Sequence, residues 1–228
     1  MKKHYSIWAT VLMGFIIFLS FYIMDIGFRT LIDSNFYPVF KVSPNFFTFS
    51  IIFIFIGIYF LINNRYRKFF YIVLNFINIV LVYLEYLNYK VSSNIVFDHL
   101  FLEIKTLISY TDYKILVVSI LSFIVSLLII PVDNNIKKIS NYQRLIVILV
   151  TILVSGIFTF LAITNLGPKV ILTSGKKSEA AKNIYLEKND MIKSIQVSGV
   201  YDNNFYQIRT LIGEKFKANQ EKIIKNYN

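Results

Sequence analysis

The sequence predicts an all-α polytopic membrane protein with five transmembrane helices, an interfacial amphipathic helix and a short helical extracytoplasmic tail. Of its 228 residues, 56% are hydrophobic and only 16% are charged. The mean hydropathy of +0.58 lies above the range of ordinary soluble domains. The charged residues also cluster between long apolar runs, which excludes a disordered chain and a charged soluble helix array.

Five apolar runs are long enough to cross a membrane as helices, because a hydrocarbon core about 30 Å thick needs ~20 apolar residues. These runs are residues 6–24, 46–62, 69–87, 115–132 and 145–163. Glu85 is the only charged residue within them. The runs lack the alternation of outer-membrane strands, so helices are predicted. The first run resembles a signal peptide, but its length favours a retained first span.

The distribution of Lys and Arg predicts the orientation of the chain. The N-terminus and the loops on its side carry eight basic residues and one acidic residue: Lys2, Lys3, Arg65, Arg67, Lys68, Lys137, Lys138 and Arg144 against Asp133. The opposite loops, to which we assign Asp25, Arg29 and Glu85, carry a small excess of acidic residues. We therefore expect a cytoplasmic N-terminus and an extracytoplasmic C-terminus.

Two domains follow from this pattern: a transmembrane domain over residues 1–163 and a helical juxtamembrane linker over residues 164–228. Between the third and fourth spans, residues 94–110 have the spacing of an amphipathic helix. Such a helix can lie in the membrane interface or be buried against the bundle, and the residue spacing does not distinguish between these two positions. The linker divides at residues 173–175 and again near Gly199, and we expect its helices to lie on the membrane surface, on the 94–110 helix or on a segment after Asn228.

The inventory of reactive side chains excludes several kinds of site. The chain has no cysteine, and its two histidines, His4 and His99, cannot form a histidine metal cage. The sequence also lacks a nucleotide-binding loop, a nucleophile elbow and a zinc-protease motif. We therefore assign no catalytic residue, no metal site and no cofactor. Asn75 and Asn78 share one face of the third span, where interhelical hydrogen bonding is the usual role.

The end of the third span holds the candidate binding residues, Lys90, Tyr89, Tyr83 and Glu85. Glu85 lies sixteen residues after Phe69, or about 24 Å along a helix, so we expect it at the outer boundary within reach of water. Spacing alone favours an interfacial ion pair beside an aromatic belt. The second hypothesis is a lipid-headgroup site in which Lys90 contacts phosphate and the tyrosines contact glycerol hydroxyls.

Two local patterns resemble those of a known family. The stretch from Tyr83 to Lys90, followed by residues 93–96, is similar to a tyrosine-rich stretch that precedes a short amphipathic helix in the lipoteichoic acid synthase family. Residues 199–207 resemble the Gly-x-Tyr run of that family, with Gln207 in place of an aspartate. Together with the predicted topology, the whole chain resembles the membrane domain and linker of these phosphoglycerol transferases.

The resemblance implies a supporting role for this chain. In the family, an extracytoplasmic metal-dependent domain follows the linker and uses a threonine nucleophile to transfer glycerol phosphate from phosphatidylglycerol to a growing polymer. No residue among the 228 corresponds to that threonine or to its metal ligands, so the enzymatic status of the chain stays open. The implied role is to anchor and orient the catalytic domain at a bacterial plasma membrane and to present lipid substrate.

The implied partners are membrane lipids, including phosphatidylglycerol, and a catalytic domain or partner protein, with no nucleic acid; homo-oligomerisation is left open. The alternative hypothesis is a free-standing, non-enzymatic interaction protein that docks a partner or anionic lipids through its basic tail. A small transporter is less favoured, because the sequence shows no internal repeat and no pair of Gly/Pro-broken helices.

Overall fold

A computed structural model describes residues 4–32, 42–63, 65–92, 112–134, 141–165, 169–171, 178–180 and 191–227. Within these ranges the chain is almost entirely helical, which confirms the all-α prediction. The predicted amphipathic helix at residues 94–110, with His99, lies outside the described residues and stays a prediction.

The helices are α1 (His4–Ile32), α2 (Val42–Leu61), α3 (Arg67–Ser92), α5 (Tyr113–Leu127), α6 (Ile129–Asn134), α7 (Asn141–Thr164) and α9 (Met191–Tyr227). Two short strands, β1 (Lys169–Ile171) and β2 (Ser178–Ala180), form an antiparallel pair in the linker. This pair was not predicted, because three-residue strands have too little alternation to be recognised.

Four helices of the described chain are long and apolar enough to cross a membrane: Ile7–Ile32, Arg67–Leu87, Tyr113–Asp133 and Asn141–Thr164. Their length and composition indicate a membrane protein. They coincide with the first, third, fourth and fifth predicted spans. The second predicted span corresponds to α2, whose apolar part, Asn45–Leu61, is shorter.

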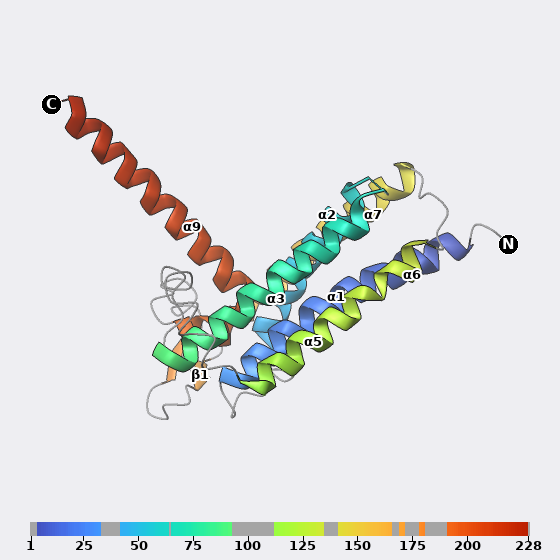
Figure 1. The fold of residues 1–228 in the computed structure, drawn as a ribbon, viewed down its shortest axis with the longest axis horizontal. Helices are drawn as coiled ribbons and strands as arrows, with labels where there is room; N and C mark the ends of the chain where they lie inside the picture. The colour runs from blue at the N-terminus through green and yellow to red at the C-terminus, as the bar shows by residue number, and fades with distance from the viewer. Residues whose placement is uncertain are drawn as a thin grey trace.

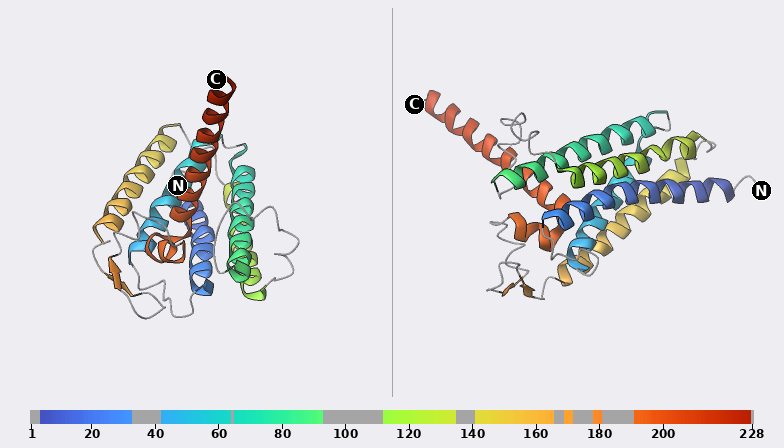
Figure 2. Two further views of the ribbon diagram at one scale, coloured as in Figure 1. Left: turned by 90° about the vertical axis from the view of Figure 1, so that its left-hand side faces the viewer. Right: turned by 60° about the horizontal axis from the view of Figure 1, so that its bottom comes forward.

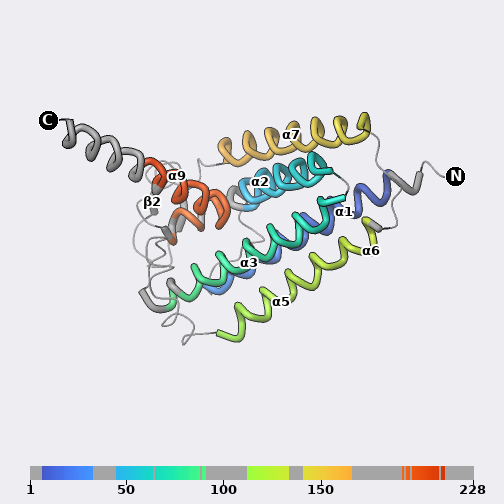
Figure 3. The backbone as a smooth tube through the Cα atoms, turned by 45° about the horizontal axis from the view of Figure 1, so that its top comes forward, coloured from blue at the N-terminus to red at the C-terminus, as the bar shows by residue number. Residues whose placement is uncertain are grey.

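Successive long helices run in opposite directions through one bundle (Figure 1). The N-terminus, the α2–α3 turn and the start of α7 lie at one end, while β1 and the first part of α9 lie at the other. Helix α7 runs beside α2, and α5 runs beside both α1 and α3 (Figures 2 and 3). Helix α9 contacts α1 and α2, so part of the linker is packed against the membrane domain.

Small polar side chains hold the helices together inside the bundle. The Ser50 hydroxyl of α2 lies 2.9 Å from the Ser155 hydroxyl and 2.6 Å from the Thr159 hydroxyl of α7. On the other side, the Ser122 hydroxyl of α5 donates to the carbonyl of Ser20 at 2.8 Å, and the Ser20 hydroxyl lies 2.6 Å from that of Tyr71. Interhelical bonds of this kind contribute about 0.6 to 2 kcal/mol in membranes.

Helix α1 extends beyond the predicted span, and this corrects the assignment of Asp25 and Arg29 to an outer loop. Both residues lie on α1 and are fully buried. The hydropathy of the run ends at Met24, but Ile26, Gly27 and Phe28 continue the packing face between the two charges. Because the two charges pair with each other inside the protein, they do not end the helix.

Arg67 and Asp133, which the sequence analysis assigned to loops between the spans, form a buried ion pair at the other end of the bundle. The Arg67 Nε atom donates to Asp133 Oδ1 at 2.7 Å, and the Tyr59 hydroxyl donates to the same oxygen at 3.4 Å. The guanidinium also lies 5.4 Å from the centre of the Tyr59 ring. These two charges therefore join α2, α3 and α6 and do not contribute to an exposed charged surface at this end of the bundle.

The close approach of α1 and α5 depends on the absence of a side chain at Gly27. A β-carbon there would lie 2.9 Å from Cγ2 of Val118 and closer still to Cγ1. By contrast, a β-carbon at Gly156 of α7 would meet no atom within 4 Å. The two glycines therefore form a matched pair for testing this contact.

We predict that Gly27→Ala lowers the free energy of unfolding by about 1–3 kcal/mol, because overpacking forces Val118 and the α5 backbone to shift. Gly156→Ala should be neutral or stabilising by up to about 1 kcal/mol, since alanine favours the helix. Reversible unfolding in detergent micelles measures both. Equal stability of the two variants would show that α1 and α5 are not packed as described.

Candidate functional site

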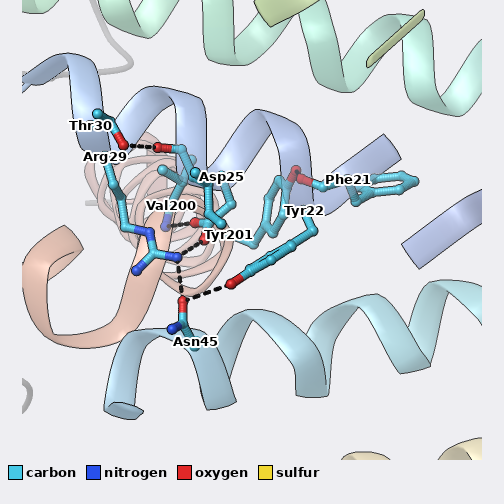
Figure 4. Close-up of polar contacts among 9 residues, drawn as sticks. Phe21, Tyr22, Asp25, Arg29, Thr30, Asn45, Val200 and Tyr201 are labelled. Atoms are coloured by element: carbon cyan, nitrogen blue, oxygen red, sulfur yellow. Dashed lines mark hydrogen bonds and ion pairs between the residues drawn. The ribbon is translucent and has the colours of Figure 1, made fainter. Parts of the chain in front are cut away.

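Asp25 and Arg29 form the centre of a buried polar site on α1. They lie one helical turn apart, and Arg29 Nη2 is 2.5 Å from Asp25 Oδ2. Both side chains are 0% exposed. A single buried charge is strongly unfavourable, and the pair is tolerated only because each charge meets the other and further hydrogen bonds (Figure 4).

Asn45 connects this ion pair to α2. Arg29 Nη2 donates to Asn45 Oδ1 at 2.7 Å, and the Tyr22 hydroxyl donates to the same oxygen at 3.5 Å (Figure 4). The amide oxygen therefore accepts from two donors on α1, and it lies near the N-terminal end of α2. This places the start of α2 relative to the C-terminal end of α1.

Gly199 divides α9 and starts a second helical segment at Val200. Its backbone has φ 82° and ψ 172°, a conformation that is essentially confined to glycine. The first N–H of the new segment, that of Val200, donates to Asp25 Oδ1 at 2.9 Å. The amide groups at the start of a helix lack partners within the helix and favour an anion. Asp25 thus binds Arg29 with one oxygen and α9 with the other.

Tyr201 fixes the next turn of α9 between α1 and α3. Its hydroxyl donates to the carbonyl of Phe21 at 2.5 Å and accepts from Asn78 Nδ2 at 3.3 Å. Burial, reinforced by the Asp25 carboxylate, raises the pKa of the Tyr201 hydroxyl well above its ordinary value. The phenol therefore stays protonated and remains a donor. The predicted interhelical bond is confirmed for Asn78, whose partner lies in the linker, but not for Asn75, whose buried amide atoms have no hydrogen-bond partner in the described part of the chain.

We call the set Tyr22, Asp25, Arg29, Asn45, Val200 and Tyr201 the junction. It corrects the expected position of the linker, whose first α9 turns are buried in the bundle: Ile195, Val197, Val200 and Tyr201 are all buried. The later residues of the predicted apolar stripe, Phe205, Ile208 and Ile212, are exposed.

The four candidate residues of the third span do not form one site. Glu85 is 0% exposed and lies near Asn204 of α9, so its predicted position at the water boundary is wrong. The Tyr89 hydroxyl donates to the carbonyl of Ile32 at 2.9 Å, which ties α3 to the end of α1. Tyr83 is half-buried against the apolar core.

Lys90 lies apart from Glu85 and pairs with Asp112 at the start of α5. Lys90 Nζ is 3.5 Å from Asp112 Oδ2, and the Tyr86 hydroxyl donates to the same oxygen at 2.8 Å. The Lys90 side chain is 44% exposed. The backbone N–H of Lys114, then the Tyr86 hydroxyl, lower the pKa of Asp112, and Lys90 adds to this effect. Asp112 is therefore ionised at neutral pH and competes with any external anion for Lys90.

The sequence did not reveal the junction, although two signals were present. Opposite charges four residues apart, as in Asp25 and Arg29, are typical of a continuing helix, yet the hydropathy window ended the span before them. The Gly-x-Tyr run was recognised as a motif, but only the fold shows that Asp25 contacts it 175 residues away in sequence.

The chemistry of the junction is that of a docking contact. Among the described residues, no group of three or more His, Cys, Asp or Glu side chains could hold a metal ion. Within the junction, Arg29 Nη2, Asp25 Oδ1 and the Tyr201 hydroxyl bond to other junction residues or to the backbone (Figure 4). The arrangement therefore fixes the position of α9 on the membrane domain.

Comparison with known proteins gives no match to a protein-family model, to a curated protein or to a solved structure. Function is therefore inferred from the site and from the sequence patterns.

We predict that Asp25→Asn lowers the free energy of unfolding by about 3–5 kcal/mol, because it removes the carboxylate from a buried ion pair. The double variant Asp25→Asn with Arg29→Gln should lose less, since no buried charge is left without its counter-charge. Unfolding of wild type, both single variants and the double variant in detergent gives the coupling energy. Strictly additive losses would contradict the buried pair.

Proposed function

We propose that this chain is the membrane-anchoring domain of a lipoteichoic acid synthase-like phosphoglycerol transferase in a bacterial plasma membrane. In this proposal it positions an extracytoplasmic catalytic domain at the bilayer and presents phosphatidylglycerol to it. The 228 residues supply the support, and the transfer chemistry belongs to the family's catalytic domain.

The docking of α9 on the bundle is the observation that supports the proposal best. The Val200 N–H and the Tyr201 hydroxyl are both bonded to α1, at Asp25 and Phe21. A linker joined to the membrane helices by buried bonds transmits their orientation to whatever follows it, whereas a flexible linker of the same length does not. Orientation matters for transfer from a lipid, because the reacting phosphate lies at a fixed depth.

The proposed topology has five spans, with α2 as the fifth crossing in addition to the four long helices. Helix α2 runs the length of the bundle beside α7, and the alternating helix directions place the start of α9 at the end opposite the N-terminus (Figure 1). The excess of Lys and Arg near the N-terminal end then favours an extracytoplasmic linker.

The first functional prediction concerns Gly199→Ala in the full-length protein of native membranes. Alanine in this backbone conformation costs about 1–3 kcal/mol and should loosen α9 from Asp25. We expect transfer of glycerol phosphate from labelled phosphatidylglycerol to fall at least about tenfold, since misplacement of reacting groups is costly. Gly213→Ala, in the same helix with no atom within 4 Å of the added carbon, should leave transfer unchanged.

Three outcomes of that experiment differ in meaning. Loss of transfer in Gly199→Ala alone supports the orienting role. Unchanged transfer, with α9 shown to be loosened, would refute orientation by the junction. A native polypeptide of 26.7 kDa in membranes without any transfer activity would instead identify a free-standing interaction protein, the alternative considered from the sequence.

The second functional prediction separates lipid binding by Lys90 from its ion pair with Asp112. If Lys90 holds an anionic headgroup, Lys90→Ala should lower and Asp112→Asn should raise the preference for phosphatidylglycerol over phosphatidylcholine, each by about two- to fivefold. Lipid exchange into nanodiscs that contain both lipids measures this preference. Absence of a change in either variant would assign Lys90 to the structural ion pair alone.

A further inference from the structure

Glu85 is a carboxyl group enclosed by the bundle where α3 meets α9. Its side chain is fully buried, and neither carboxylate oxygen has a hydrogen-bond partner in the described part of the chain. Asn204 of α9 lies within interaction range of this carboxyl group. The Asn204 Oδ1 atom is likewise buried without a hydrogen bond to any described residue. Glu85 of α3 and Asn204 of α9 thus bring two buried side chains into contact, and neither the Glu85 oxygens nor the Asn204 Oδ1 atom has a close hydrogen bond to a described residue.

The hydrogen-bond donors available at this contact indicate whether Glu85 is ionised or neutral. An ionised carboxylate only accepts hydrogen bonds, and a buried anion without donors is strongly unfavourable. A neutral carboxyl group carries one O–H donor, and the Asn204 amide can present its oxygen to that proton after a half-turn about its terminal bond. One proton on Glu85 therefore gives both side chains a partner.

Among the described residues, the groups that interact with Glu85 carry no positive charge. The Tyr201 hydroxyl of α9 lies in electrostatic range of Glu85 and Tyr71 of α3 and of Asp25 of α1. The Asp25 side chain pairs with Arg29 and accepts from the Val200 N–H. Tyr201 stays a neutral phenol, as shown above.

We infer that Glu85 is a proton-binding site, neutral while α9 is docked and hydrogen-bonded through its proton to Asn204. Loss of the proton leaves a buried anion, and α9 must move to admit water. Because the docked state binds one proton more than a state with hydrated Glu85, docking weakens as the pH rises. This inference does not depend on the phosphoglycerol transferase proposal, since it concerns only the contact between α3 and α9.

The protonation state is tested directly by infrared spectroscopy of the full chain at neutral pH. The spectrum of the wild type minus that of Glu85→Gln should contain the C=O stretching band of a neutral carboxyl group. Asp112→Asn is the matched control, because Asp112 lies at the same end of the bundle and is ionised, so its difference spectrum should contain a carboxylate band. A carboxylate band for Glu85 at neutral pH would overturn the inference.

The coupling to docking is tested by the hydrogen-exchange protection factor of the Val200 amide, which reports its bond to Asp25. Protection in the wild type should fall by at least about tenfold over the pH range in which the infrared band of the neutral Glu85 carboxyl group disappears. Glu85→Gln, which mimics the neutral form, should keep its protection over the same range. Equal pH profiles for the two proteins, with Glu85 titrating, would show that the proton does not hold α9.

Discussion

The Asp25 carboxylate is the group on which the arrangement of the membrane domain and its linker depends. One oxygen meets the Arg29 guanidinium and the other meets the Val200 N–H, all within a buried environment. Neither charge is tolerable alone at this depth, because transfer of an unpaired ion out of water costs several kcal/mol. The ion pair on α1 therefore requires its hydrogen-bonding surroundings, and α9 supplies part of them.

This constraint explains features that are otherwise unrelated. Gly199 is needed because only a sharp turn brings a fresh helix N-terminus to the carboxylate, and Asn45 is needed because the guanidinium has more donors than Asp25 can accept. The opposite end of the bundle repeats the principle with Arg67 and Asp133. Between these two polar contacts, the helices are joined by serine and threonine hydroxyls and by the close approach at Gly27. This is expected in a membrane, where the hydrophobic effect does not favour helix–helix contact over helix–lipid contact.

Hydropathy predicted the long helices well, because apolar runs near the thickness of a membrane are rare outside such proteins. It failed at Asp25, Arg29 and Glu85, since a window average treats a charge as a boundary and cannot represent a partner that lies far away in sequence. Asn78 was assigned an interhelical bond from its position alone, but its partner Tyr201 could not be predicted. Lys90 was placed correctly near the end of α3, whereas its acidic partner, Asp112, depends on how α5 packs.

The most direct test of this account measures whether the first turns of α9 are buried against the membrane helices. The chain has no native cysteine, so single cysteines can be introduced without background. Membrane-impermeant maleimide should label Tyr206→Cys and Ile208→Cys readily, because both positions are exposed, and should leave Ser194→Cys and Ser198→Cys, which are buried, unlabelled until the protein is denatured. Equal and rapid labelling at all four positions would contradict the docking of α9 and with it the role of Asp25.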